Sequence, residues 1–164
     1  MVSPAQTFTT LKFFNGTNGE EPFAAPVEGL DGNLYGTTQS DGKYSSGTVY
    51  KIIPQGVLTR LHNFRKVSGC PDGAMPLGGL MQGTDGWLYG TTWAFGADNA
   101  GTVFRISTAG KLETFSSFCA EANCGDGAQP QSTLLQGCDG YVYGTTLEGG
   151  AYGWGTIFKT ADIN

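Results

Sequence analysis

The chain has 164 residues, of which 27 are glycine and only 14% are charged, and its formal net charge is −5. Glycine reaches positive φ without steric cost and weakens helices, so this composition favours short strands joined by tight turns. An aromatic content of 12% argues against disorder. The scattered Lys and Arg residues form no basic stripe, which argues against a nucleic-acid partner. No stretch approaches the roughly 18 apolar residues of a membrane span, and residues 1–4 lack the pattern of a signal peptide.

The first predicted element is a strand over residues 6–14, and a repeat of 54 residues follows it. Internal repeats decide the fold class, because each copy forms one structural unit. One motif reads Asp-Gly-x-Leu/Val-Tyr-Gly-Thr-Thr, and a second reads Gly-Thr-Val/Ile-aromatic-Lys/Arg. The first occurs at residues 31–38, 85–92 and 139–146, and the second at residues 47–51, 101–105 and 155–159.

Each copy predicts four short strands. In the middle copy these strands cover residues 76–82, 87–92, 101–107 and 111–118. The first two are joined by Asp85-Gly86, which favours a type I′ hairpin turn because both central positions need positive φ. Helical periodicity is absent. Four antiparallel strands per unit, repeated in register, predict an all-β protein built of β-propeller blades.

The blades are expected to form one domain over residues 1–164, with repeats in chain order at about 6–55, 56–110 and 111–164. Tyr35, Tyr89 and Tyr143 are expected to fill the space between neighbouring sheets. The glycine that follows each of them permits a close approach of the backbone.

The two ends of the chain predict how the ring closes. Residues 6–14 match the fourth strand of the other copies, whereas the last copy stops at a third strand over residues 156–161. Propellers typically have about four to eight blades, so three blades do not close a ring. We therefore expect a homodimer, joined head to tail, to form a six-bladed ring in which each first strand completes the partner's last blade. A nine-bladed trimer and a piece of a longer propeller are the alternatives.

A further motif, Asp-Gly-Ala-x-Pro, occurs at residues 72–76 and 126–130. Together with the other two motifs it resembles the choice-of-anchor (GloVer-type) tandem repeats of bacterial secreted and surface proteins. The resemblance implies a propeller and an extracellular or cell-surface location, and it implies no catalytic residues. The first copy departs from the pattern, because Glu20-Glu21-Pro22 stands where Asp-Gly-Ala-x-Pro is expected.

Two of the four cysteines, Cys119 and Cys124, lie in one loop, and a disulfide between them is expected for a secreted protein. Cys70 and Cys138 fall in turns on opposite faces of the expected propeller, so both are expected to be free thiols. Structural zinc usually needs paired Cys or His residues at close spacing, and the chain has a single histidine. No metal site is therefore expected.

The residue types that catalysis needs do not form a recognisable set. His62 lies on a predicted outer strand, where a solvated or packing role is expected rather than that of a base. Neither a Gly-x-Ser-x-Gly elbow nor a phosphate-binding loop occurs. Five of the aspartates that precede glycine are explained as turn formers: Asp31, Asp72, Asp85, Asp126 and Asp139. The protein is expected to be no enzyme and to need no cofactor.

The loops between the second and third strands differ among the copies, and binding in repeat proteins often resides in such loops. They combine aromatic rings with carboxylates and amides, which suits carbohydrate: a ring covers the apolar face of a sugar, and polar groups bind its hydroxyls. Packing between blades is the alternative role for each aromatic side chain. The candidate ligand-binding residues are Asp41, Tyr44, Trp93, Phe95, Asp98, Asn99, Glu148, Tyr152 and Trp154.

The sequence thus predicts a non-enzymatic, lectin-like propeller module whose repeated loops bind glycans multivalently. A structural or protein-interaction scaffold without a small ligand is the alternative. An enzyme with acidic residues at the ring axis is a third, weaker reading.

Overall fold

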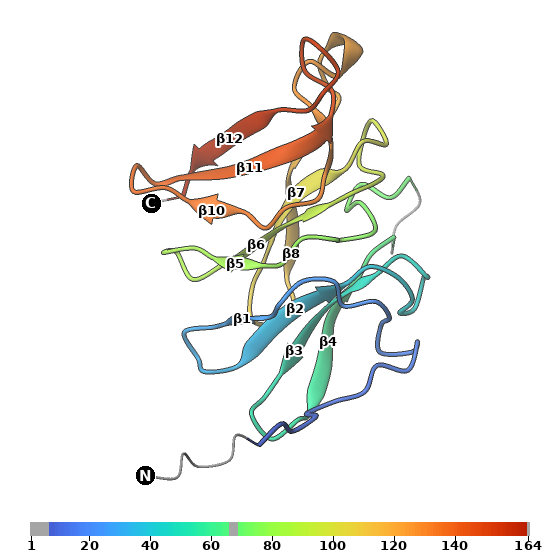
Figure 1. Cartoon of the computed structure of the whole chain (residues 1–164), viewed down its shortest axis with the longest axis vertical. Helices are drawn as coiled ribbons and strands as arrows, with labels where there is room; N and C mark the ends of the chain where they lie inside the picture. Colours follow the sequence, from blue (N-terminus) through green and yellow to red (C-terminus); the bar gives the residue numbers. More distant parts are fainter. Residues whose placement is uncertain (1–6, 66–68, 164) are drawn as a thin grey trace.

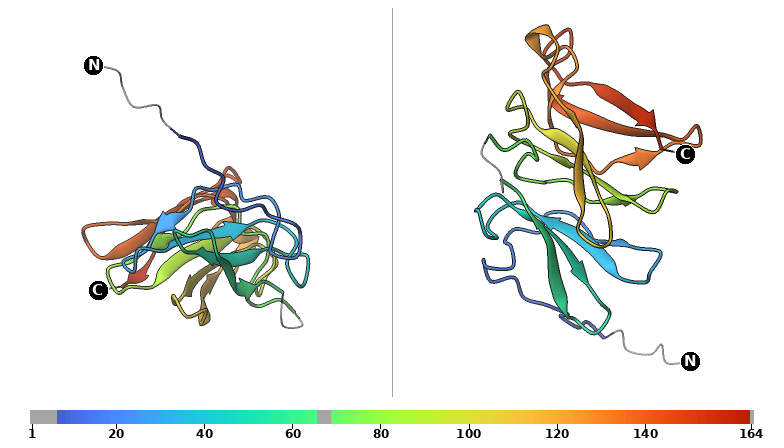
Figure 2. Two further views of the ribbon diagram at one scale, coloured as in Figure 1. Left: turned by 90° about the horizontal axis from the view of Figure 1, so that it is seen from below. Right: turned by 180° about the vertical axis from the view of Figure 1, so that it is seen from behind.

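The computed structural model describes residues 7–65 and 69–163, which fold into three four-stranded antiparallel sheets (Figure 1). The sheets follow one another along the chain and stack in the same order, as Figure 2 also shows. Within the described ranges the only helical segment is a 3-10 turn, η1, over Ala122–Cys124. None of the described helices is long and apolar enough to cross a membrane.

The strands of each sheet pair with their neighbours in chain order. In the third sheet the order is β10-β11-β12, and β9 pairs with the far part of the long strand β11. The first sheet holds β1 (Val27–Glu28), β2 (Leu34–Thr38), β3 (Thr48–Ile52) and β4 (Leu58–Asn63); the second holds β5 (Met81–Gln82), β6 (Leu88–Thr92), β7 (Thr102–Ile106) and β8 (Leu112–Ser117); the third holds β9 (Ala128–Pro130), β10 (Leu135–Gln136), β11 (Tyr141–Glu148) and β12 (Ile157–Asp162).

Two predicted strands differ from the structure. The strand expected at residues 76–82 pairs only over Met81–Gln82, because the Gly78 carbonyl accepts a hydrogen bond from Thr37 of the first sheet instead. The strand expected at residues 6–14 is not formed over its described part, residues 7–14. This segment runs along the outer side of the first sheet, at one end of the stack, and no strand lies beside it to pair with (Figures 1 and 2).

The core consists of two apolar layers, one between each pair of neighbouring sheets. Tyr35 and Phe104 belong to the layer between the first and second sheets. Tyr89 and Phe118 belong to the layer between the second and third. Tyr35 and Tyr89 therefore fill the space between sheets, as the sequence predicts, whereas Tyr143 stays half-buried at the open end of the stack.

The Asp-Gly hairpins explain the first repeated motif. Gly86 has φ 82°, but Asp85 has no positive φ, so the type I′ turn predicted at Asp85-Gly86 is wrong. The Gly86 N–H donates to the Gly83 carbonyl at 3.0 Å, which places Thr84 and Asp85 at the centre of the turn. The Asp85 carboxylate accepts a hydrogen bond from the Trp87 N–H at 3.1 Å. The same carboxylate accepts the Tyr89 hydroxyl at 2.8 Å. Burial, followed by this hydrogen bond, raises the pKa of Tyr89 to about 12. The aspartate thus fixes both the turn and the core tyrosine behind it.

Candidate functional site

The three variable loops, at residues 39–47, 93–101 and 149–156, lie on one side of the stack (Figure 1). The hairpin turns lie on the other side, because successive turns of an antiparallel sheet alternate between its two ends. The loop backbone is tied to the outer strands, since the Lys43 N–H donates to Asn63 Oδ1 at 2.9 Å and the Ala97 N–H to Ser117 Oγ at 3.2 Å. The loop side therefore presents a defined surface, which we call the loop face.

Trp93 is the most firmly positioned of the candidate aromatic residues. It is half-buried, and its indole Nε1–H donates to Gln129 Oε1 at 3.1 Å. The amide of Gln129 in turn donates to Glu148 Oε2 at 3.2 Å. Trp93 and Glu148, which are 55 positions apart, are thus joined through a glutamine that sequence reasoning did not select.

Phe95 lies in the same loop but is occupied by a neighbour. The guanidinium of Arg65 lies 4.7 Å from the centre of its ring, and the Arg65 Nε–H donates to the Cys70 sulfur at 3.3 Å. Asp98 and Asn99 are exposed at the tip of this loop. The loop therefore carries an exposed carboxylate and an exposed amide together with two aromatic rings. Among the described residues, a cation lies over the Phe95 ring and none lies over the Trp93 ring.

The first loop carries a charged, polar surface. Asp41 and Tyr44 are half-buried, and the Lys43 ammonium lies 5.3 Å from the centre of the Tyr44 ring. A side-chain hydrogen bond with Asp41, together with repulsion between the two carboxylates, raises the pKa of Glu20. Tyr44 is the one aromatic residue of this loop, and a ligand that stacks on its ring would compete with Lys43.

The third loop has the most exposed aromatic side chains of the candidate set. Tyr152 is 88% exposed and Trp154 is 90% exposed. Their counterparts one repeat earlier differ in burial. Asp98, the counterpart of Tyr152, is exposed, whereas Ala100, the counterpart of Trp154, is buried by the following sheet. The exposure of Trp154 therefore reflects its place at the open end of the stack, and Tyr152 is the exposed ring that belongs to the loop face itself.

His62 has a partner that the sequence did not reveal. Its Nε2 lies 3.0 Å from Asp72 Oδ2, and its ring packs edge-on against Phe64. Both side chains are mostly buried, and the second oxygen of Asp72 has no hydrogen-bond partner in the described chain. The interpretation of Asp72 as only a turn former was thus incomplete, because it also pairs with the histidine, which has a packing role.

The cysteines and metal-ligand residues have ordinary environments. Cys119 and Cys124 form a disulfide, as expected from the sequence. Cys70 is a buried free thiol and Cys138 an exposed one. Within residues 7–65 and 69–163, no group of three or more His, Cys, Asp or Glu side chains is placed to hold a metal ion.

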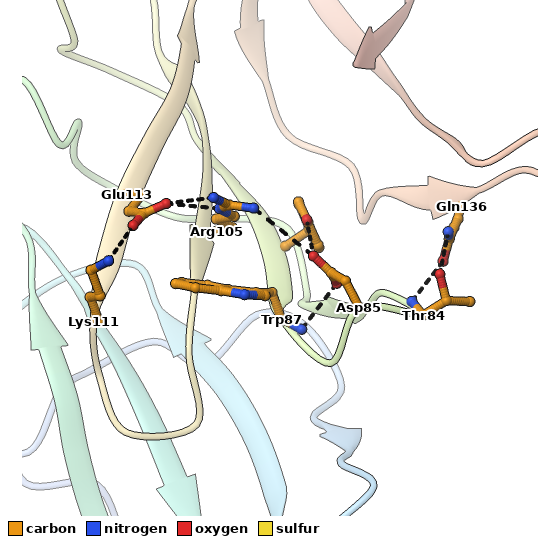
Figure 3. Close-up of polar contacts among 8 residues, drawn as sticks. Thr84, Asp85, Trp87, Arg105, Lys111, Glu113 and Gln136 are labelled. Atoms are coloured by element: carbon orange, nitrogen blue, oxygen red, sulfur yellow. Dashed lines mark hydrogen bonds and ion pairs between the residues drawn. The ribbon is translucent and has the colours of Figure 1, made fainter. Parts of the chain in front are cut away.

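A charged cluster surrounds Trp87 on the hairpin side (Figure 3). The Arg105 guanidinium lies 4.5 Å from the centre of the Trp87 ring and bonds to Glu113 Oε2 at 2.7 Å. Hydrogen bonds from Lys111 and Arg105 lower the pKa of Glu113. The hydrogen bond to Glu113 in turn raises the pKa of Arg105. Two cations, Arg105 and Lys111, lie over the Trp87 ring, and we interpret the cluster as one that stabilises the sheet.

Comparison with protein families identifies the repeat. A family model described as the Gloeobacter/Verrucomicrobia repeat matches residues 1–158. The chain belongs to this repeat family. The match confirms the resemblance seen in the three motifs, and it reaches from the first sheet to the beginning of β12 in the third.

Other comparisons add little about function. No curated protein sequence matches the chain. Among solved structures, an X-ray structure of a protein assigned as a gluconolactonase is similar, with 15% identity and a TM-score of 0.47. The match covers 83% of this chain and 43% of that protein, so this chain spans less than half of its length. A likeness this low supports no inference about activity.

Proposed function

We propose that the protein is a non-enzymatic binding module whose loop face takes carbohydrate. The observation that carries this proposal is the chain of contacts from Trp93 through Gln129 to Glu148. An indole held by its own N–H keeps a fixed orientation, so less side-chain entropy is lost when a sugar stacks on it. A carboxylate in the same network accepts hydrogen bonds from sugar hydroxyls.

The polar groups of the second loop complete the candidate site. Asp98 and Asn99 are exposed in the loop that carries Trp93. The Asp98 carboxylate accepts hydrogen bonds, and the Asn99 amide both donates and accepts them. Gln39 and Leu147 stand in the place of Trp93 in the other two copies. The chain therefore offers one such site rather than three, and multivalent binding requires more than one copy of the chain.

The experiment is a screen on a glycan array, followed by titration of the best-binding glycan. Trp93→Ala is expected to weaken binding about tenfold or more, because central aromatic contacts dominate binding free energy. Glu148→Ala is expected to weaken it as well, with no effect on folding because the Glu148 side chain is exposed. Glu121→Ala, which removes an exposed carboxylate from the disulfide loop, is the matched control and is expected to bind normally.

The alternative function is a structural or protein-interaction scaffold. It is favoured by large apolar side chains that are exposed at both ends of the stack, namely Phe8, Phe13, Trp154 and Ile157. If no glycan binds, or if Trp93→Ala and Glu148→Ala bind as well as the unchanged protein, the carbohydrate proposal is wrong. Failure of the whole array would favour the scaffold.

A non-enzymatic role and an extracellular or cell-surface location are parts of the same proposal. The single histidine is committed to Asp72 and Phe64 in the interior, which makes it a poor general base for an external substrate. The disulfide between Cys119 and Cys124 favours an oxidising compartment. Activity assays on sugar lactones and glycosides, with no turnover expected, test the first part.

A further inference from the structure

Positions that are equivalent in the repeat differ sharply in burial at the open end of the stack. Ile157 of β12 is 83% exposed, whereas its counterparts Val49 and Val103 are 0% and 1% exposed. Thr145 is likewise exposed, although its counterparts Thr37 and Thr91 are buried. The third sheet thus presents to solvent a surface that the first and second sheets bury.

On the hairpin side, a hydrogen bond joins each of the first two sheets to the sheet that follows it, and Figure 3 shows the second of these bonds. The Leu30 N–H donates to Gln82 Oε1 of the next sheet at 2.8 Å. One repeat later, the Thr84 N–H donates to Gln136 Oε1 at 3.0 Å. After Leu30 and Thr84, the next donor in this series is the N–H of Cys138. The residue of the first sheet that is equivalent to Gln82 and Gln136 is Glu28. Neither Cys138 nor Glu28 forms such a bond within the described residues.

The loop side repeats the pattern. The Met75 N–H donates to the Ser46 carbonyl at 2.9 Å, and the Gln129 N–H to the Ala100 carbonyl at 2.8 Å. Both donors have φ 58°, an uncommon conformation for residues other than glycine. Glu21, their counterpart, has φ 58° too, yet no such bond holds it within the described chain. The first sheet therefore already has the backbone shape of a junction that it does not form.

The segment at residues 7–14 occupies the place of a fourth strand from a preceding sheet. Phe14 packs edge-on against Tyr50 with ring centres 5.3 Å apart. Phe64, which directly follows β4, packs against Phe104 in the same way, also at 5.3 Å. Phe8 and Phe13 in this segment are 95% and 79% exposed. The segment is thus seated like β4 and β8, but it has no strand to pair with.

We propose that these two surfaces bind each other between two copies of the chain, joined head to tail at both ends. Residues 7–14 of each copy pair with β12 of the other and complete its third sheet. Glu28 and Glu21 of one copy bond to the backbone of Cys138 and Trp154 in the other. The register follows from β3–β4 and β7–β8: Phe13 pairs with Thr156, Lys12 with Ile157, Thr10 with Phe158, Thr9 with Lys159, and Phe8 with Thr160.

Two copies, rather than three, fit the usual size of such rings. Rings of radially arranged four-stranded sheets typically have about four to eight blades, and six is the only multiple of three in that range. Closure also removes the free edge of β12, which would otherwise be open to unspecific pairing. The partner is therefore a second copy of this chain, which carries both complementary surfaces itself.

This inference is independent of carbohydrate binding, because none of the contacts in it involves Trp93 or Glu148. The two proposals therefore fail separately. A protein that binds no glycan can still form the ring, and a monomer can still bind a sugar through one site.

Light scattering after gel filtration measures the mass of the full chain over a range of concentrations. We expect twice the chain mass of 17.2 kDa. Ile157→Asp and Trp154→Asp are expected to give folded monomers, because both side chains are exposed in a single copy. Tyr152→Asp is the matched control: its counterpart Asp98 is exposed beside a formed junction, so the variant is expected to remain a dimer. A monomeric or trimeric wild-type protein, or an Ile157→Asp variant with unchanged mass, would overturn the proposal.

Discussion

Replacement of Tyr89 by alanine tests how the repeated tyrosines hold the sheets together. The ring is 1% exposed in the layer between the second and third sheets, and it packs edge-on against Phe115 with ring centres 6.3 Å apart. Truncation of a buried aromatic ring to alanine costs about 3–5 kcal/mol. The hydroxyl also donates to Asp85, which remains in contact with the Trp87 N–H after the substitution. We expect Tyr89→Ala to lower the free energy of unfolding by about 4 kcal/mol.

Tyr89→Phe separates the ring from the hydroxyl. It removes only the hydrogen bond to a carboxylate, for which we expect a loss of about 1.5 kcal/mol. Both values are measured by urea unfolding followed by circular dichroism. Tyr152→Ala, which truncates an exposed tyrosine, is the control and should leave the unfolding midpoint unchanged. A loss below about 1 kcal/mol for Tyr89→Ala would refute the assignment of this ring to the core.

Three further outcomes follow from the structure. Burial and then hydrogen bonding to Asp31 and Asp85 raise the pKa of Tyr35 and Tyr89 to about 12, so the unfolded chain loses these protons first. Stability is therefore expected to fall between pH 10 and 12, by up to roughly 2–3 kcal/mol per tyrosine, and Tyr35→Phe with Tyr89→Phe should flatten this fall in urea titrations. Cys119→Ser with Cys124→Ser removes the disulfide, so that no closed loop constrains the unfolded chain. We expect the free energy of unfolding to fall by about 2 kcal/mol in the same assay. Gly90→Ala places a methyl group against the Phe104 ring. This overpacking should lower the free energy of unfolding by about 1–3 kcal/mol and so lower the melting temperature. An unchanged melting temperature would contradict that contact.

The repeat made much of the fold predictable. The 54-residue spacing locates the strands that begin with Leu34, Leu88 and Tyr141, because motifs with turn glycines and alternating side chains depend on local geometry. It did not reveal that residues 76–80 leave the sheet. That departure depends on the contact of the Gly78 carbonyl with Thr37, a neighbour 41 positions away.

The candidate site was less predictable than the fold. Sequence patterns selected the aromatic residues of the loops, but they could not separate Trp93, held by Gln129, from Phe95, covered by Arg65. Nothing in the sequence distinguishes Gln82 and Gln136 from other polar residues. In the structure, each accepts a hydrogen bond from a backbone N–H of a neighbouring sheet. Contacts between repeats depend on how the sheets stack, and a single sequence carries no direct signal of them. The contacts of Gln82 and Gln136 could have been found by comparing equivalent positions of the repeat, here residues 28, 82 and 136.

The pairing of residues 7–14 with β12 of a second copy is tested most directly by an engineered disulfide. Thr9→Cys with Lys159→Cys places two thiols at directly paired positions, equivalent to Thr59–Lys51 and Glu113–Arg105. A Cys138→Thr background removes the exposed native thiol, and Thr9→Cys with Ile157→Cys is a control out of register, too distant to bridge. We predict a covalent dimer after mild oxidation of the paired variant, and none from the control. Monomer alone, or equal cross-linking in both variants, would contradict a ring closed by two copies in this register.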